Sequence, residues 1–156
     1  MVLTCLSNLG FDKKIIQKGL KNIYNPGRFE WLAPNILVDT ANNAENIKIL
    51  AKMVDKLPNK NIVTLFGTTQ VDPESAKELA KMIPTRERIL IDDFCDRSLP
   101  YSSYADEVKH TEKIHLLHEE EKIKKWLQEK EKTIVIYGSF YLIGEIMRLS
   151  RYQPFA

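Results

Sequence analysis

Residues 36–43 read Ile36-Leu-Val-Asp39-Thr-Ala-Asn-Asn43 and define the unit from which the fold is built. An apolar run ends in a carboxylate and a polar turn follows it. Apolar residues then recur at helical spacing, at Ile47, Leu50, Ala51, Val54 and Leu57. A short run without alternating polar residues is typical of a strand buried on both faces of a parallel sheet, and the spacing after it predicts an amphipathic helix.

The same alternation recurs along the chain. Further apolar runs lie at 62–66, 89–91, 114–117 and 133–137, and helices are expected at about 73–82, 101–108, 119–130 and from 139 to about 150. Residues 28–32 are expected to add an edge strand. An N-terminal helix is expected over 11–22, with Asp12 as its N-cap. The pattern predicts one Rossmann-like α/β domain, with a mostly parallel sheet of about five to six strands and helices on both faces.

The composition excludes several classes of protein. The 156 residues are 44% hydrophobic and 28% charged, with a formal net charge of +2. A charge this close to zero gives no electrostatic case for nucleic acid or an anionic membrane, and no apolar stretch approaches the ~20 residues that span a bilayer. Residues 1–10 lack the basic region and cleavage site of a signal peptide. With only Cys5 and Cys95 present, we expect a cytoplasmic protein without disulfides.

Polar residues follow each predicted strand, at 39–43, 67–70, 92–93 and 138–139. Because parallel α/β sheets bind ligands at the carboxyl ends of their strands, we expect any site to lie there. Asp39 has two interpretations: it holds a ribose hydroxyl beside a helix N-terminus that faces an anion, or it caps the following helix. The sequence contains no Gly-Lys-Ser/Thr, so it has no phosphate-binding loop with its lysine.

Three histidines, His110, His115 and His118, precede the acidic run 119–121. Their spacing matches no familiar zinc site, and a strand around His115 is expected to turn this side chain away from its neighbours. We therefore predict no metal site.

The charged run 119–132 is interpreted as a solvated helix. Its ion pairs are expected at i,i+4 spacing, between Glu120 and Lys124 and between Glu121 and Lys125.

Three motifs, in order and in register, suggest a family. Asn25-Pro-Gly-Arg-Phe-Glu30, Ile36 to Asn46 and Ile134 to Glu145 resemble the W-P-G-R-x-E, L-D-G-A-H-N-P and V-T-G-S-L-Y-L-V-G-E stretches of folylpolyglutamate synthase/dihydrofolate synthase. The resemblance covers residues 11–150. It implies that residues 25–156 are the Mur ligase C-terminal-like (glutamate ligase) domain. Residues 1–24 are then a remnant of the preceding domain's last helix and linker.

The resemblance also implies a reaction. In this family ATP phosphorylates a carboxylate, and the amine of glutamate attacks the acyl phosphate to form an amide. The implied activity is addition of glutamate to a folate or to dihydropteroate, with ATP and Mg as cofactors of the full-length parent and none held by this domain alone. Arg28 and Asp39 are the implied nucleotide contacts, and Asn42, Asn43 and Ser139 the implied substrate contacts. No residue is assigned a catalytic role.

The sequence departs from the family at one of these motifs. Asn42 stands where the family has His, and an amide cannot carry a proton as imidazole does. The glycine-rich phosphate loop, magnesium ligands and modified lysine of the family's first domain have no counterpart in this sequence. We expect the isolated chain to be inactive because the ATP-binding domain is missing. We also expect it to be a monomer. The alternative is a non-catalytic Rossmann-like binding or interaction domain that has lost the chemistry.

Overall fold

The computed structural model describes residues 2–21, 23–69, 71–109 and 112–150. The strands are β1 Glu30–Ala33, β2 Ile36–Asp39, β3 Ile62–Phe66, β4 Glu87–Asp92, β5 Glu112–His115 and β6 Thr133–Tyr137. The helices are α1 Val2–Asn8, α2 Lys13–Lys21, α3 Ala44–Val54, α4 Pro73–Lys81, α5 Glu120–Leu127 and α6 Phe140–Leu149. Two short 3-10 turns, η1 Tyr101–Ser103 and η2 Ala105–Glu107, join β4 to β5.

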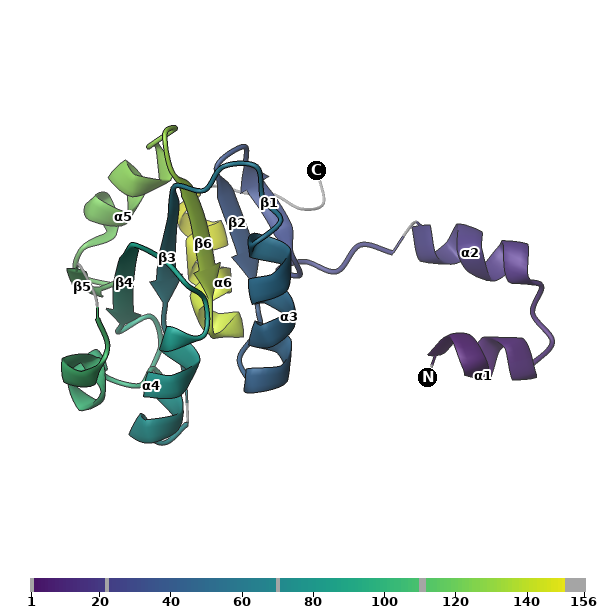
Figure 1. The fold of residues 1–156 in the computed structure, drawn as a ribbon, viewed down its shortest axis with the longest axis horizontal. Helices are drawn as coiled ribbons and strands as arrows, with labels where there is room; N and C mark the ends of the chain where they lie inside the picture. Colours follow the sequence, from purple (N-terminus) through teal and green to yellow (C-terminus); the bar gives the residue numbers. More distant parts are fainter. Residues whose placement is uncertain (1, 22, 70, 110–111, 151–156) are drawn as a thin grey trace.

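The strands form one six-stranded sheet in the order β1-β2-β6-β3-β4-β5 (Figure 1). All neighbouring strands are parallel except β1 and β2, which are antiparallel. The predicted fold class and the edge strand are therefore confirmed. Because β6, the last strand in the chain, lies between β2 and β3, the strand order reverses at the carboxyl ends of these three strands, which is where such sheets bind ligands.

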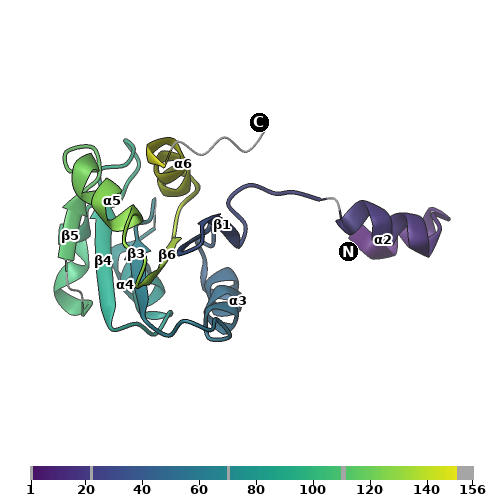
Figure 2. The ribbon, with the colours of Figure 1, turned by 90° about the horizontal axis from the view of Figure 1, so that it is seen from above.

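Helices cover both faces of the sheet, α3 and α4 on one and α5 and α6 on the other (Figure 2). Successive residues of each central strand alternate between the two layers, as a pleated strand requires. In β6, Val135 and Tyr137 pack in the layer that contains Leu50 of α3. Ile134 and Ile136 pack in the opposite layer, with residues of α5 and α6. This double coverage explains why β2, β3 and β6 are largely apolar.

The two N-terminal helices lie away from the sheet, and residues 23–26 lead toward it without forming a helix or strand (Figures 1 and 2). Asp12 Oδ1 accepts a hydrogen bond from the Lys14 amide at 2.8 Å, which confirms the predicted N-cap. Of the apolar residues in α2, Ile16 is buried, whereas Ile15 is 63% exposed. Asn22, the predicted end of this helix, lies outside the described residues. Among the helices of the described ranges, none is long and apolar enough to cross a membrane.

Two local predictions were wrong. Residues 101–108 form the turns η1 and η2 instead of a helix, because Tyr104 between them has a φ of −142° and packs its ring into the core. On α5, the expected i,i+4 ion pairs are replaced by others. Glu121 pairs with Lys124 at 2.6 Å, and Glu120 pairs with Arg148 of α6 at 2.7 Å. The neighbouring helix competes for the glutamate.

Two glycines allow the carboxyl ends of β3, β4 and β6 to pack backbone against backbone. Gly138 has a φ of +114°, and a Cβ added there would clash with the carbonyl oxygen of Gly67. A Cβ on Gly67 would lie 2.5 Å from the carbonyl oxygen of Ile91. Glycine is required at both positions because neither neighbouring atom is the end of a flexible side chain.

Replacing Gly138 by Ala is expected to lower the free energy of unfolding by about 3 kcal/mol, because it adds both backbone strain and overpacking. The matched control is Gly144→Ala, in α6, where an added Cβ meets nothing within 4 Å. That change is expected to stabilise the helix by about 0.5–1 kcal/mol. Urea unfolding of both variants measures the difference, and a Gly138→Ala variant as stable as the wild type would disprove the close contact.

Candidate functional site

The Asn25–Glu30 turn is fixed against the end of β2 by a set of hydrogen bonds. The carboxylate of Glu30 accepts from the Gly27 amide at 2.6 Å and also from the hydroxyl of Tyr24. The Thr40 amide donates to the Gly27 carbonyl oxygen at 2.7 Å. Gly27 and Phe29 have φ values of +72° and +44°, which make the chain turn sharply on either side of Arg28. This conformation leaves the Arg28 side chain exposed at the carboxyl edge of the sheet.

Asp39 joins this turn to the loop that follows β2. One carboxylate oxygen accepts from the Phe29 amide at 2.8 Å, and the other accepts from the Ala41 amide at 2.7 Å. Asp39 is therefore not the cap of α3, because Asn43 fills that position and accepts from the Asn46 amide at 3.0 Å. A carboxylate has about four acceptor positions, so Asp39 keeps capacity to accept a further donor.

Arg28 lies beside the N-terminus of α6. Its guanidinium carbon is 5.1 Å from the centre of the Phe140 ring, within the range of a cation–π interaction. Ser139 is buried and caps the helix, with its Oγ accepting from the Tyr141 amide at 3.2 Å. The first and third of the three sequence motifs thus meet at one point. A cation and a helix N-terminus, both favourable to an anion, lie side by side there.

Asn42 and Asn43 lie on the other side of β2's carboxyl end, where they are exposed. They line a shallow cavity of about 390 Å³ between the N-termini of α3 and α4. Residues of α4, among them Glu74 and Ser75, form the opposite wall. Asp72 caps α4 and accepts from the Ser75 amide and hydroxyl, and these hydrogen bonds lower the pKa of the Asp72 carboxyl. Gln70, in the preceding loop, lies outside the described residues.

A second group of polar side chains lies at the ends of β4 and β5. The Nδ1 atom of His115 is 2.6 Å from the buried carboxylate of Asp92, and its Nε2 atom is 2.6 Å from the hydroxyl of Tyr101. Nε2 of His118 is 3.1 Å from Asp93. The expectation that His115 turns away from the neighbouring histidines was wrong for His118, because the two ring centres lie 6.5 Å apart. His115 is the last residue of β5 and reaches across to Asp92 at the end of β4.

The polar side chains at the ends of β4 and β5 therefore bind mainly one another. Burial, together with the nearby carboxylates of Asp92 and Glu119, raises the pKa of the Tyr101 phenol. His110 lies outside the described residues. Within the part of the chain that the structure describes, no group of three or more His, Cys, Asp or Glu side chains is placed to hold a metal ion.

The sequence motifs located the positions of the site residues at the strand ends better than they located the side-chain contacts. They placed Arg28, Asp39, Asn42, Asn43 and Ser139 near strand ends, and the structure brings Arg28, Asp39 and Ser139 to neighbouring positions. Phe140 was missed as a partner of Arg28. The available sequence signal was an aromatic residue directly after Gly138-Ser139. In the structure, this residue is 53% exposed.

Known proteins with this fold were found by structure alone. No protein-family model matches the sequence, and no curated protein matches it either. An Escherichia coli FolC structure in complex with ADP, without folate substrate, matches with a TM-score of 0.78 and 18% identity over 94% of this chain and 37% of its own. A Mycobacterium tuberculosis folylpolyglutamate synthase complexed with ADP and AMPPCP matches with a TM-score of 0.71 and 19% identity, over 96% and 38%.

A Thermotoga maritima folylpolyglutamate synthase has a TM-score of 0.68 and 22% identity, again over 96% of this chain and 37% of that one. At these identities the matches establish a shared fold. The chain spans little more than a third of the length of each of these solved structures.

Asp39→Ala is expected to destabilise the protein by about 2–3 kcal/mol, because two amides lose a charged acceptor. Asp39→Asn is expected to lose about half as much, since the carboxamide keeps one acceptor oxygen. The control is Asp96→Ala, an exposed acid at the same edge of the sheet, for which no measurable change is expected. Urea unfolding compares the three, and equal stability of Asp39→Ala and Asp96→Ala would refute the anchoring role of Asp39.

Proposed function

We propose that this chain is the C-terminal domain of an ATP-dependent ligase that adds glutamate to a folate, or to dihydropteroate, through an acyl phosphate. Residues 25–156 form the glutamate-ligase domain, and residues 1–24 are the last helix and linker of a preceding domain. The observation that carries the proposal is the meeting of the Arg28 turn, Asp39 and the N-terminus of α6 at one edge of the sheet. The enzyme works in the cytoplasm as a monomer.

The nucleotide side of this site is built around Arg28. Its guanidinium is exposed and is held beside α6 by Phe140, a geometry suited to phosphate or ribose oxygens. Asp39 fixes the turn that presents Arg28 and retains acceptor positions toward a ribose hydroxyl. The fold similarity to structures that are complexed with ADP supports this assignment.

The amino-acid side of the site is assigned to Asn42, Asn43 and Ser139. Asn42 and Asn43 line the open cavity between α3 and α4, where amide groups donate to carboxylate oxygens and accept from an ammonium. Ser139 is buried and caps α6, so its contribution to substrate binding is to hold the helix N-terminus in place.

ATP supplies the phosphoryl group that activates the acceptor carboxylate. The exposed cation and helix N-terminus of this chain fit the phosphates of a nucleotide. No metal ligand is assigned to the chain, since the described residues contain no suitable cluster. Magnesium, like the main phosphate cradle, belongs to the ATP-binding domain of the parent. The chain's own residues therefore bind and orient, and none is assigned a proton transfer.

A second candidate function is a non-catalytic binding domain that kept the fold. The observation in its favour is Asn42, a neutral amide at the position where the resembled family has His. A binding domain of this kind need not retain Arg28 in a position to contact a nucleotide. Nucleotide binding that depends on Arg28 therefore separates the two functions.

Arg28→Gln is expected to weaken binding of a fluorescent ADP analogue by about tenfold, the loss of one charge-assisted contact. The matched control is Arg148→Gln at the opposite end of α6, which carries an exposed guanidinium paired with Glu145 and Glu120. Fluorescence titration with magnesium present measures both. Equal affinities of the two variants would contradict nucleotide binding at Arg28 and favour the non-catalytic function.

Incubating the chain with ATP, magnesium, a folate and glutamate is expected to give no ligation product, because the phosphate-binding loop is absent from this sequence. Chromatographic detection of a polyglutamylated folate measures the product. Robust product formation would show that no second domain is required.

A further inference from the structure

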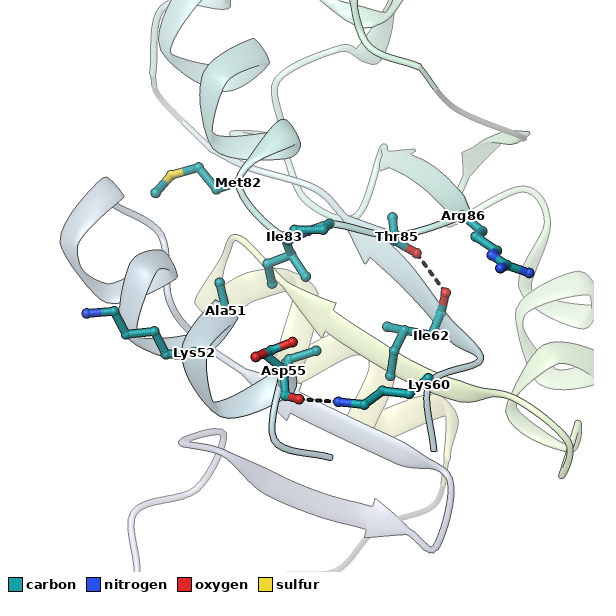
Figure 3. Close-up of a pocket in the computed structure, with 11 residues that line it drawn as sticks. Ala51, Lys52, Asp55, Lys60, Ile62, Met82, Ile83, Thr85 and Arg86 are labelled. Carbon is teal, nitrogen blue, oxygen red and sulfur yellow. Dashed lines mark hydrogen bonds between the residues drawn. The ribbon is translucent and has the colours of Figure 1, made fainter. Parts of the chain in front are cut away.

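A cavity in the described part of the molecule lies at the opposite edge of the sheet from the proposed ligase site. It has a volume of about 610 Å³ and opens between the C-terminal half of α3, the start of β3 and the segment between α4 and β4 (Figure 3). This is within the range of about 300–1,000 Å³ that small-molecule sites occupy. The proposed ligase function makes no use of this cavity.

The walls of the cavity are largely apolar. The apolar lining consists of Ala51, Val54, Ile62, Met82, Ile83 and Pro84, of which Val54, Ile62 and Ile83 are buried. Thr85 links the segment before β4 to the start of β3, because its Oγ1 donates to the Ile62 carbonyl oxygen at 2.7 Å (Figure 3).

The rim of the cavity is cationic. Lys52, Lys60 and Arg86 line it together with a single carboxylate, Asp55. Lys60 donates to the backbone carbonyl of Asp55, which leaves its charge uncompensated. Within the described residues, the side chains of Lys52 and Arg86 make no hydrogen bond or ion pair, and they extend outward from the cavity (Figure 3). Unpaired cations around an apolar interior complement a ligand with an apolar body and a negative charge.

The geometry points to a binding site for a small apolar carboxylate, an aromatic or aliphatic acid whose body fills the cavity while its carboxylate meets the cationic rim. Lys60 reaches into the cavity (Figure 3), and its ammonium keeps two further donors beside the hydrogen bond to Asp55, which assigns the main polar contact to Lys60. Asp55 opposes the ligand and lowers its affinity. The site is separate from the strand ends that carry Arg28 and Asp39, so the failure of either proposal leaves the other standing.

Three probes with the same apolar body test the charge that the site prefers. They are 3-phenylpropionate, 3-phenylpropan-1-ol and 3-phenylpropylamine, titrated at millimolar concentration into the isotope-labelled full chain and followed by amide chemical shifts. Saturable shifts are expected at Ala51, Ile62, Ile83 and Thr85. The carboxylate is expected to bind about fivefold more tightly than the alcohol, and the amine more weakly than both.

Rim variants test the assigned contacts. Lys60→Gln is expected to lower the affinity for 3-phenylpropionate by about three- to fivefold, and Asp55→Asn to raise it about twofold. The matched control is Lys48→Gln, an exposed cation of α3 that does not line the cavity, for which no change is expected. The proposal is overturned by the absence of saturable shifts at the cavity residues, by equal binding of the amine and the acid, or by a Lys60→Gln affinity equal to that of Lys48→Gln.

Discussion

The close approach of backbone to backbone at the carboxyl ends of β3, β4 and β6 is the constraint on which the rest of the site depends. Gly67 and Gly138 permit this approach because neither carries a Cβ. The positive φ of Gly138 turns the chain directly from β6 into α6, so the N-terminus of the helix is held at the edge of the sheet. Without that turn, Phe140 would not lie beside Arg28.

Asp39 provides a second constraint, because it links the Arg28 turn to the loop that follows β2. Its two oxygens accept from the Phe29 and Ala41 amides, so they fasten the Arg28 turn to the loop before α3. A carboxylate at a strand end is often interpreted as a ligand contact. Here its partners are two backbone amides, and the charge that faces solvent belongs to Arg28. Positioning and contact are thereby divided between two residues.

Much of the fold could be predicted because burial on both faces leaves a plain signal in sequence. The runs at 36–39, 62–66 and 133–137 match β2, β3 and β6 residue for residue. Prediction failed where distant segments decide local structure. Residues 101–108 do not form a helix, because the Tyr101 amide donates to Asp92 and Tyr104 packs into the core. Glu120 of α5 pairs with Arg148 of α6 instead of with a lysine of its own helix. The contact between Arg28 and Phe140 joins residues more than a hundred positions apart, and no local pattern encodes it.

In the proposed function, nucleotide binds at the carboxyl edge formed by β2, β6 and β3. Amide chemical-shift mapping of the isotope-labelled chain with magnesium and ADP tests it most directly, because it locates weak binding residue by residue. Shifts are expected at 27–29, 39–41 and 138–141, with the amino edge of the sheet unchanged. Shifts confined to the amino edge, or no saturable shift at the carboxyl edge, would contradict nucleotide binding at this edge.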